Sequence, residues 1–276
     1  MTSSCIIVQI TDPHVGRSIR YPSGKVYMYD ELVKTVNCIK EMNSLPDLVL
    51  VSGDLAHHGN VSDYDKSKTL LDTLGIPYYL AAGNHDVRSA MREVFKDHTY
   101  LFSGTDYIQY TIEYLPVRII VLDTLAVGSH RGLLDQERLA WIDKKLNEQR
   151  ERDTLICMHH PPFETGMPYP DHLGLDGIQE LGEIIRSYHN VGAVISGHTH
   201  RDSSRLWNGT VAYVTPSCSF SYDLEFNEVE DVDPLNEPPA VRVLRWDSVS
   251  GIISHLCYTH THEYGVSEGV PAAPEN

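Results

Sequence analysis

Short apolar runs recur along the first half of the chain and alternate with amphipathic stretches. The runs at Cys5–Ile10, Leu48–Leu55 and Tyr78–Ala82 are rich in aliphatic or aromatic residues and predict buried strands. Between them, Asp30–Asn43 and Ser62–Leu74 carry apolar residues at helical spacing and predict helices. Strands that alternate with helices in this way are typical of a mainly parallel sheet covered by helices.

The stretch Val15–Tyr29 interrupts this alternation and predicts a long loop. It is rich in Gly, Ser, Tyr and Arg, and loops of this length are usually functional or cover a site. Its three tyrosines, Tyr21, Tyr27 and Tyr29, leave two interpretations open, because such rings either stack on a nucleobase or pack against the domain. Packing is the interpretation that we favour.

The second half continues with helices and strands and then becomes mostly strands. Helices are predicted at Asp135–Arg150 and Gly177–Tyr188, where apolar residues repeat on one face. Further strands are predicted at Tyr107–Leu115, Arg118–Leu125, Thr154–Met158, Val191–Ser196, Thr210–Thr215, Val241–Asp247 and Gly251–Thr259. The 276 residues are enough for one large α/β domain, with or without a small appendage.

Charge and cysteine content narrow the class of protein. The chain has 22 Lys and Arg against 38 Asp and Glu, a net charge of −16, so it lacks the basic surface expected for binding duplex nucleic acid. Its five cysteines are scattered without Cys-x-x-Cys spacing and predict buried free thiols. The chain has no apolar run of membrane-spanning length and no signal-peptide pattern, so we expect a cytoplasmic protein without membrane contact.

Five of the predicted strands end in residues that can bind metal ions. These residues are Asp12 and His14, Asp54, Asn84 and His85, His159, and His198 and His200. Because the carboxyl ends of parallel strands lie along one edge of a sheet, we expect the five clusters to face one crevice. A Gly precedes Asp54, Asn84 and His198, which permits a sharp exit from the strand and a close backbone approach.

The mixture of residue types predicts a site for two metal ions. Asp12, Asp54, Asn84 and the four histidines His14, His159, His198 and His200 make seven ligands, and sharing Asp54 gives each metal four. The set contains no thiolate, so the residues suit iron, manganese, cobalt or zinc rather than soft ions.

The motifs as a set resemble the calcineurin-like metallophosphoesterase superfamily. They are Asp12-x-His14, Gly53-Asp54, Gly83-Asn84-His85-Asp86, His159-His160-Pro161 and Gly197-His198-x-His200, in this order, and the resemblance covers roughly residues 5–260. Finer features resemble the branch of class III cyclic-nucleotide phosphodiesterases and bacterial glycerophosphodiesterases. They are Met158–Pro162, Leu122-Asp123-Thr124, Gly132-Leu133-Leu134, Trp141 and the Lys25–Asp30 loop.

The resemblance implies a fold and a division of the ligands between the metals. The implied fold is a four-layer α/β/β/α sandwich of two mixed sheets with flanking helices. One metal would be bound by Asp12, His14, Asp54 and His200, and the second by Asp54, Asn84, His159 and His198. His85 would contact the phosphate and assist the leaving group, with Asp86 orienting it. His160 is expected to be structural, and His57 and His58 either line the pocket or belong to a solvated loop.

The implied function is hydrolysis of small phosphodiesters by a metal-bridging hydroxide, with cyclic nucleotides among a broad range of substrates. Three alternatives stay open: a glycerophosphodiester phosphodiesterase, a phosphomonoesterase and a non-catalytic metal-binding scaffold.

The domain organisation follows from the same resemblance and from local composition. We expect a catalytic domain over 1–220, strands that complete the sandwich over 241–262, and a loose tail over 263–276. Between them, residues 221–240 are acidic, and Tyr222–Pro239 contains seven acidic residues and no Lys or Arg. This segment is either a solvated loop or a lid or arm that contacts a second copy of the chain in a homo-oligomer.

Overall fold

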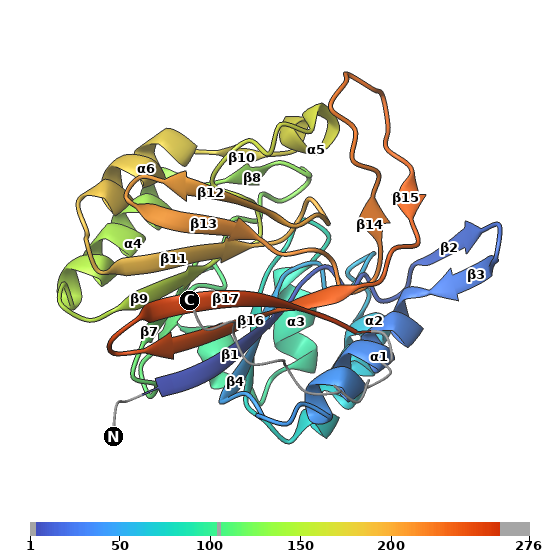
Figure 1. Ribbon diagram of the computed structural model, residues 1–276, viewed down its shortest axis with the longest axis horizontal. Helices are drawn as coiled ribbons and strands as arrows, with labels where there is room; N and C mark the ends of the chain where they lie inside the picture. Colours follow the sequence, from blue (N-terminus) through green and yellow to red (C-terminus); the bar gives the residue numbers. More distant parts are fainter. Residues whose placement is uncertain (1–3, 104–105, 260–276) are drawn as a thin grey trace, which may run out of the picture.

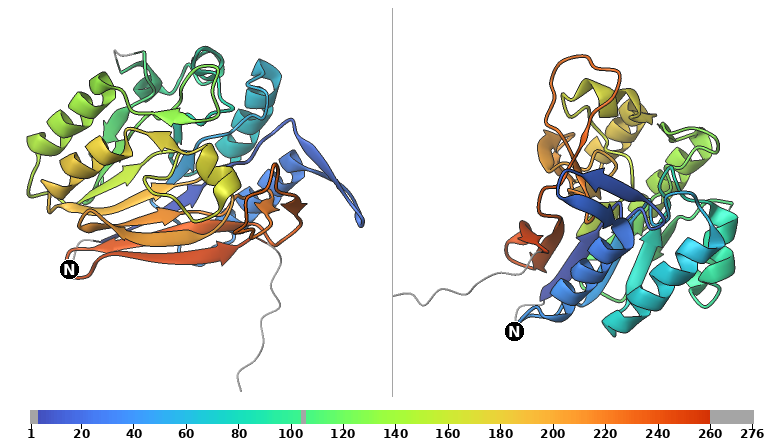
Figure 2. Two further views of the ribbon diagram at one scale, coloured as in Figure 1. Left: turned by 90° about the horizontal axis from the view of Figure 1, so that it is seen from above. Right: turned by 90° about the vertical axis from the view of Figure 1, so that its right-hand side faces the viewer.

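Two mixed β-sheets pack face to face, with helices on their outer faces (Figures 1 and 2). We describe this architecture from a computed structural model that covers residues 4–103 and 106–259. The arrangement is the predicted α/β/β/α sandwich. The predicted loose tail over 263–276 lies outside the described residues, as do the last three residues of the predicted 241–262 strand segment.

The first sheet contains the N-terminal strands and the two C-terminal strands. In spatial order it is formed by β17 (Gly251–Tyr258), β16 (Ala240–Asp247), β1 (Ser4–Ile10), β4 (Leu48–Ser52) and β5 (Tyr78–Ala81). Strands β1, β4 and β5 are parallel, and β16 and β17 are antiparallel to their neighbours. The parallel arrangement predicted for the first half of the chain is therefore confirmed.

The second sheet contains the strands of the middle of the chain. Its order is β12 (Ser203–Trp207), β13 (Thr210–Val214), β11 (Val191–Ser196), β9 (Thr154–Cys157), β7 (Arg118–Val121) and β6 (Tyr110–Ile112). The four central strands are parallel and the two edge strands are antiparallel. The carboxyl ends of β9 and β11 thus open at the same edge of this sheet.

Alternate residues of the second sheet enter two different hydrophobic cores. Leu155 and Cys157 belong to the core between the two sheets, whereas Ile156 belongs to the core beneath the outer helices. Both faces of β9 are buried, because successive side chains of a strand point to opposite faces. This explains why β9 is a continuous apolar run rather than an alternating one.

Helices cover the outer faces. They are α1 (Met28–Lys40), α2 (Val61–Leu71), α3 (Arg88–Val94), α4 (Gln136–Glu148), α5 (Pro168–His172) and α6 (Ile178–Arg186), with short 3-10 turns at Asp72–Leu74 and Thr99–Phe102. Ile142 of α4 and Ile185 of α6 pack on the second sheet. Among the described residues, none of the helices is long and apolar enough to cross a membrane.

The predicted loop Val15–Tyr29 is in fact largely structured, so this prediction was wrong. It contains the hairpin of β2 (Ser18–Tyr21) and β3 (Gly24–Tyr27), followed at once by α1. The hairpin was not predicted because its two strands are only four residues long and bury only one side chain, that of Ile19. Strands that are this short and this exposed lack the apolar pattern from which a strand is predicted.

Two further pairs of short strands and one edge strand were also not predicted. The pairs are β8 (Gly132–Leu133) with β10 (Leu175–Asp176), and β14 (Ser221–Tyr222) with β15 (Pro234–Leu235), besides the β2–β3 hairpin. The edge strand β12 was not predicted because it is exposed and polar along most of its length. The β14–β15 pair closes the acidic 221–240 segment into a long loop (Figure 1).

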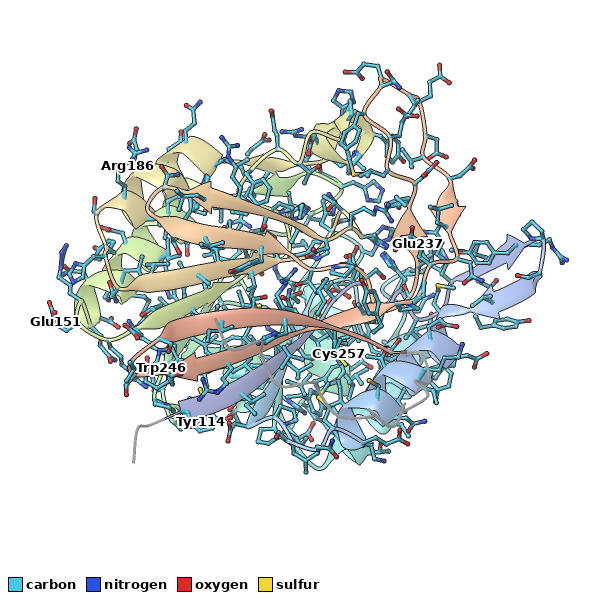
Figure 3. All side chains as sticks on the ribbon, viewed as in Figure 1. Tyr114, Glu151, Arg186, Glu237, Trp246 and Cys257 are labelled. Atoms are coloured by element: carbon cyan, nitrogen blue, oxygen red, sulfur yellow. The ribbon has the colours of Figure 1, made fainter. Side chains whose placement is uncertain are left out.

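All five cysteines lie in the described ranges and are free. Cys5, Cys157 and Cys218 are buried, as predicted. Cys38 of α1 and Cys257 of β17 are instead only half-buried, and their Sγ atoms lie 3.9 Å apart (Cys257 is labelled in Figure 3).

Candidate metal centre

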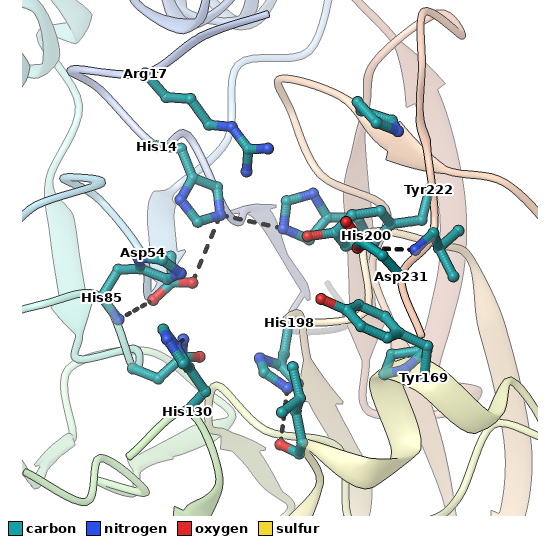
Figure 4. Close-up of a pocket in the computed structure, with 15 residues that line it drawn as sticks. His14, Arg17, Asp54, His85, His130, Tyr169, His198, His200, Tyr222 and Asp231 are labelled. Atoms are coloured by element: carbon teal, nitrogen blue, oxygen red, sulfur yellow. Dashed lines mark hydrogen bonds and ion pairs between the residues drawn. The ribbon is translucent and has the colours of Figure 1, made fainter. Parts of the chain in front are cut away.

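The predicted metal-binding clusters meet at one end of the sandwich. The clusters that follow β1, β4 and β5 come from the first sheet, and those that follow β9 and β11 come from the second. The prediction had placed all five on one sheet edge. The two sheets present their carboxyl ends to the same cavity, so the clusters converge although they belong to different sheets (Figure 4).

Four of the predicted ligands form a first group around His14. His14 Nε2 lies 3.1 Å from His200 Nε2, 3.5 Å from Asp54 Oδ2 and 3.9 Å from Asp12 Oδ1. His200 Nε2 lies 3.4 Å from Asp12 Oδ1. These four side chains are the set that the resemblance assigns to one metal.

The remaining predicted ligands form a second group around His159. His159 Nε2 lies 3.0 Å from Asn84 Oδ1 and 3.5 Å from Asp54 Oδ2. The His198 ring lies beside the His159 ring, with centroids 5.2 Å apart. Asp54 Oδ2 is thus equidistant from the two groups, while Asp54 Oδ1 accepts a hydrogen bond from the backbone N–H of His85 at 2.8 Å.

The backbone is strained at most of these positions. Six non-glycine residues of the described chain have a φ angle in the left-handed region, and five of them are predicted ligands: Asp12 (54°), His14 (47°), Asp54 (53°), His198 (71°) and His200 (57°). Only a few per cent of non-glycine residues adopt this conformation, and such strain clusters at functional sites. The fold therefore holds these side chains in place at a cost in stability.

Gly197 allows the two sheets to approach each other at the site. A Cβ atom at this position would lie 1.9 Å from Thr11 Oγ1 and 2.5 Å from Asp12 Oδ2. The backbone N–H of the next residue, His198, donates to the same carboxylate oxygen at 3.0 Å. The glycine that precedes His198 therefore provides the close backbone approach that the sequence predicted.

Three of the histidines donate one ring N–H to a backbone carbonyl. His159 Nδ1 lies 2.9 Å from Ser52 O, His200 Nδ1 lies 2.9 Å from Phe220 O, and His198 Nε2 lies 3.0 Å from Leu173 O. Donation from one ring nitrogen directs the other nitrogen at the centre, where it can bind a metal ion, as is usual for metal-binding histidines.

The Asp12 carboxylate is likewise held by hydrogen bonds to one of its oxygens, while the other oxygen has no donor in the described part of the chain. Its Oδ2 atom accepts hydrogen bonds from Thr11 Oγ1 at 2.7 Å and from the backbone N–H of His198. Its Oδ1 atom is buried and has no hydrogen-bond partner among the described residues. A buried carboxylate oxygen without a donor is costly unless a cation faces it.

The electrostatics of the centre favour positive charge. Burial alone would raise the pKa of Asp54, but the facing His159 holds it well below its usual value. Burial would conversely lower the pKa of His159, yet the Asp54 carboxylate raises it to about 9. Burial lowers the pKa of His14 well below its usual range and that of His198 to about 3, so both rings are neutral and can offer a lone pair.

His85 lines the cavity, but its ring is not oriented as predicted. Its Nδ1 atom donates to the carbonyl oxygen of His57 at 2.8 Å, so this carbonyl, rather than Asp86, orients the ring. Asp86 points the other way and accepts from Gly83 N at 2.9 Å and Tyr64 Oη at 2.9 Å. Its carboxylate therefore shapes the turn that carries Asn84 and His85, and the implied role of Asp86 in orienting the His85 ring was wrong.

Three other histidines near the site, His57, His58 and His160, have no predicted role in metal binding. His160 has both ring nitrogens occupied, by Thr124 Oγ1 at 2.8 Å and His130 O at 3.1 Å, which agrees with a structural role. His58 is exposed, as expected for a solvated loop. His57 is half-buried, and its Nδ1 atom lies 3.1 Å from His14 Nδ1.

No individual residue of the outer wall of the cavity was predicted from the sequence, although a lid was one of the two interpretations of the 221–240 segment. The cavity has a volume of about 290 Å³ and is lined, beyond the predicted ligands and His85, by Arg17, His130, Tyr169, Pro170, Leu173, Tyr222, Asp231, Val232 and Pro234. His130 Nδ1 lies 3.0 Å from Asn84 Nδ2. The residues of α5 and of the 221–240 segment reach the cavity from positions without any recognisable motif.

The three tyrosines of the predicted loop do not belong to this wall. Of the described residues that line the cavity, none is Tyr21, Tyr27 or Tyr29. Tyr21 Oη donates to Leu235 O at 3.3 Å, and Tyr29 packs against the main core. The packing interpretation holds for Tyr21 and Tyr29, while Tyr27 is half-exposed.

The donor set as a whole fits a dinuclear metal site. It offers nitrogen and carboxylate ligands in two adjacent groups, with one carboxylate oxygen between them. The buried oxygen of Asp12 without a donor and the lone pairs directed at the centre are what bound cations would satisfy.

Known proteins agree with this picture. The "Probable glycerophosphodiester phosphodiesterase GpdQ" of Arcobacter nitrofigilis is 32% identical over 257 residues, which cover 92% of this chain and 93% of that protein. The "3',5'-cyclic adenosine monophosphate phosphodiesterase CpdA" of Haemophilus influenzae is 25% identical over 235 residues, covering 83% and 82%. Relatives with both names confirm the resemblance to the cyclic-nucleotide and glycerophosphodiester branch.

Solved structures share the fold at low sequence identity. A dimetal phosphatase from Danio rerio is 15% identical with a TM-score of 0.66, covering 93% of this chain and 99% of that one. A purple acid phosphatase from yellow lupin is 16% identical with a TM-score of 0.66, covering 94% of this chain and 52% of that one. The family model described as calcineurin-like phosphoesterase matches residues 6–202. The chain therefore belongs to the calcineurin-like phosphoesterase family.

Proposed function

We propose that the protein hydrolyses small phosphodiesters at a centre of two transition-metal ions. The observation that carries the proposal is the position of Asp54 Oδ2, 3.5 Å from His14 Nε2 and 3.5 Å from His159 Nε2. One oxygen atom that faces two groups of ligands is suited to bridge two cations. Nitrogen and carboxylate ligands without thiolates suit iron, manganese, cobalt or zinc.

The chain's own groups have distinct tasks in this reaction. Bound metal ions of this type would polarise the phosphoryl oxygens and lower the pKa of a water molecule. Asp12 and Asp54 would supply the negative charge that holds the cations, and the backbone carbonyls of Ser52, Phe220 and Leu173 keep the histidine rings in place. His85 faces the cavity with Nε2, since its Nδ1 proton is donated to His57 O, and is placed to serve the leaving oxygen.

The size of the cavity supports a small substrate. About 290 Å³ is near the lower limit of ordinary ligand pockets. We favour a broad range of phosphodiesters that includes cyclic nucleotides. Glycerophosphodiesters are the second candidate, and they are favoured by the relative of that name at 32% identity over 92% of the chain.

A substrate panel tests the proposal. The purified protein is loaded with manganese, iron, cobalt or zinc and assayed with cyclic AMP, glycerophosphodiesters, bis(p-nitrophenyl) phosphate and phosphomonoesters. We expect turnover of the diesters, little turnover of the monoesters, and loss of all turnover with a chelator. Turnover of monoesters alone would contradict the diester assignment, and no turnover with any metal would favour the non-catalytic scaffold.

The role of His85 is tested by comparing the effect of its replacement on substrates with different leaving groups. We expect His85→Ala to lower kcat on an alkyl diester such as a glycerophosphodiester by about 100-fold, a typical contribution of a general acid. On bis(p-nitrophenyl) phosphate, whose leaving group needs little protonation, we expect a much smaller loss. An equal loss on both substrates would show that His85 binds the phosphate instead. The exposed neighbour His58→Ala is the matched control and should retain full activity.

A further inference from the structure

The His57 ring lies between two residues of the centre. Its Nδ1 atom is 3.1 Å from Nδ1 of His14, a predicted metal ligand. Its ring stacks on His85, with centroids 4.7 Å apart and planes at 19°, and meets His14 edge-on at 70°. Among the described residues that line the cavity, His57 is absent, so it acts on its neighbours rather than on a substrate.

The backbone fixes this position. Residues 14–15 and 54–57 are joined by hydrogen bonds from His14 N to Asp54 O at 2.9 Å and from Val15 N to Leu55 O at 3.1 Å. His57 N then donates to Val15 O at 2.8 Å. The loop after β4 is thereby laid alongside the loop after β1, and the His57 ring is held against the His14 ring.

Only one proton can lie between the two facing nitrogens. His14 Nε2 faces Asp54 Oδ2 and His200 Nε2, so it is the His14 atom placed to bind a metal. A ring nitrogen binds a metal only through its lone pair. A neutral imidazole with a lone pair on Nε2 carries its proton on Nδ1. His14 must then donate from Nδ1, and the atom in range to accept is His57 Nδ1.

We propose that His57 is a positioning residue that accepts the His14 Nδ1 proton and so fixes the ring and tautomer with which His14 binds the first metal. Histidine ligands usually donate the proton of the ring nitrogen that faces away from the metal to a carbonyl or carboxylate, as His159 and His200 do from Nδ1 and His198 does from Nε2. For His14 the acceptor is a second imidazole. The inference rests on the proposed metal centre, but it is independent of the substrate.

Metal affinity gives a readout that does not involve turnover. Calorimetric titration of the metal-free full chain with manganese should resolve two binding events in the wild type. We expect His57→Ala to weaken one event by about 10- to 100-fold, the usual effect of removing such a partner, and to leave the other unchanged. His57→Asn, whose side-chain oxygen can accept the same proton, should recover most of the loss. His58→Ala is the matched control, because His58 is the exposed neighbour in the same loop.

A spectroscopic measurement on the wild type does not depend on any variant folding. In the zinc-loaded protein, long-range ¹H–¹⁵N spectra should show His14 protonated at Nδ1 and His57 protonated at Nε2. The opposite tautomers, or unchanged affinity in His57→Ala, would overturn the inference. A wild type that binds two metals but hydrolyses no phosphodiester would contradict the proposed function alone, since the affinity change in His57→Ala would still support the role of His57.

Discussion

Replacing Asp54 with Asn will lower kcat/KM for bis(p-nitrophenyl) phosphate by at least about 1,000-fold, or about 4 kcal/mol of transition-state stabilisation. The substitution keeps the shape of the side chain and removes its charge. Asp54 is 2% exposed, and its Oδ2 atom lies 3.5 Å from His14 Nε2 in one ligand group and 3.5 Å from His159 Nε2 in the other. Its loss therefore weakens both metal positions, whereas His200→Ala removes a ligand from one group only and should cost less.

The control for this variant is Asp97→Asn. Asp97 is exposed and pairs with Lys68, so its replacement should leave activity unchanged. Circular dichroism and thermal unfolding of both variants will separate loss of chemistry from loss of fold. Unchanged turnover in a folded, metal-loaded Asp54→Asn protein would contradict the bridging role.

Replacing Asp123 with Ala will lower the free energy of unfolding by about 3–5 kcal/mol, because it leaves buried positive charge without its partner. Asp123 is fully buried and accepts hydrogen bonds from Arg88 Nε at 2.7 Å and from Arg88 Nη2 at 2.8 Å. It also accepts from Ile108 N at 2.7 Å and from Leu125 N at 2.9 Å. One carboxylate thus joins α3 to the loop that follows β7, and its removal leaves these donors unsatisfied.

Urea unfolding measures this effect. The matched control is Asp176→Ala, which removes an exposed ion pair with Arg131 and should cost no more than about 1 kcal/mol. If Asp123→Ala does not fold, Asp123→Asn keeps hydrogen-bond acceptance and gives a smaller loss that can be measured. A change below 1 kcal/mol in a folded Asp123→Ala protein would show that water replaces the carboxylate.

The metal-binding residues could be predicted because the strands that precede them are largely buried. A strand such as β4 is apolar until its carboxyl end, so the first polar residue after it, Asp54, marks the edge of the sheet. The same pattern identified the clusters after β1, β5, β9 and β11. The position of these residues follows from the local sequence and from the direction of each strand. Both can be predicted from the hydrophobic pattern.

The outer wall could not be predicted because its residues meet only through the tertiary fold. Asp231 and Tyr169 come from segments far apart in sequence, and neither lies in a regular apolar pattern. The error over Asp86 has a similar origin. The resemblance implied that Asp86 orients His85, but the turn directs the Asp86 carboxylate to Gly83 N and Tyr64 Oη, and the carbonyl of His57 orients the ring instead.

Anomalous X-ray scattering from crystals loaded with manganese or zinc tests the metal centre most directly. We expect two anomalous peaks, one among Asp12, His14 and His200 and the other among Asn84, His159 and His198. Both peaks should lie about 2.0–2.2 Å from an Asp54 carboxylate oxygen. A single peak, or two peaks of which only one contacts Asp54, would contradict a dinuclear centre bridged by Asp54.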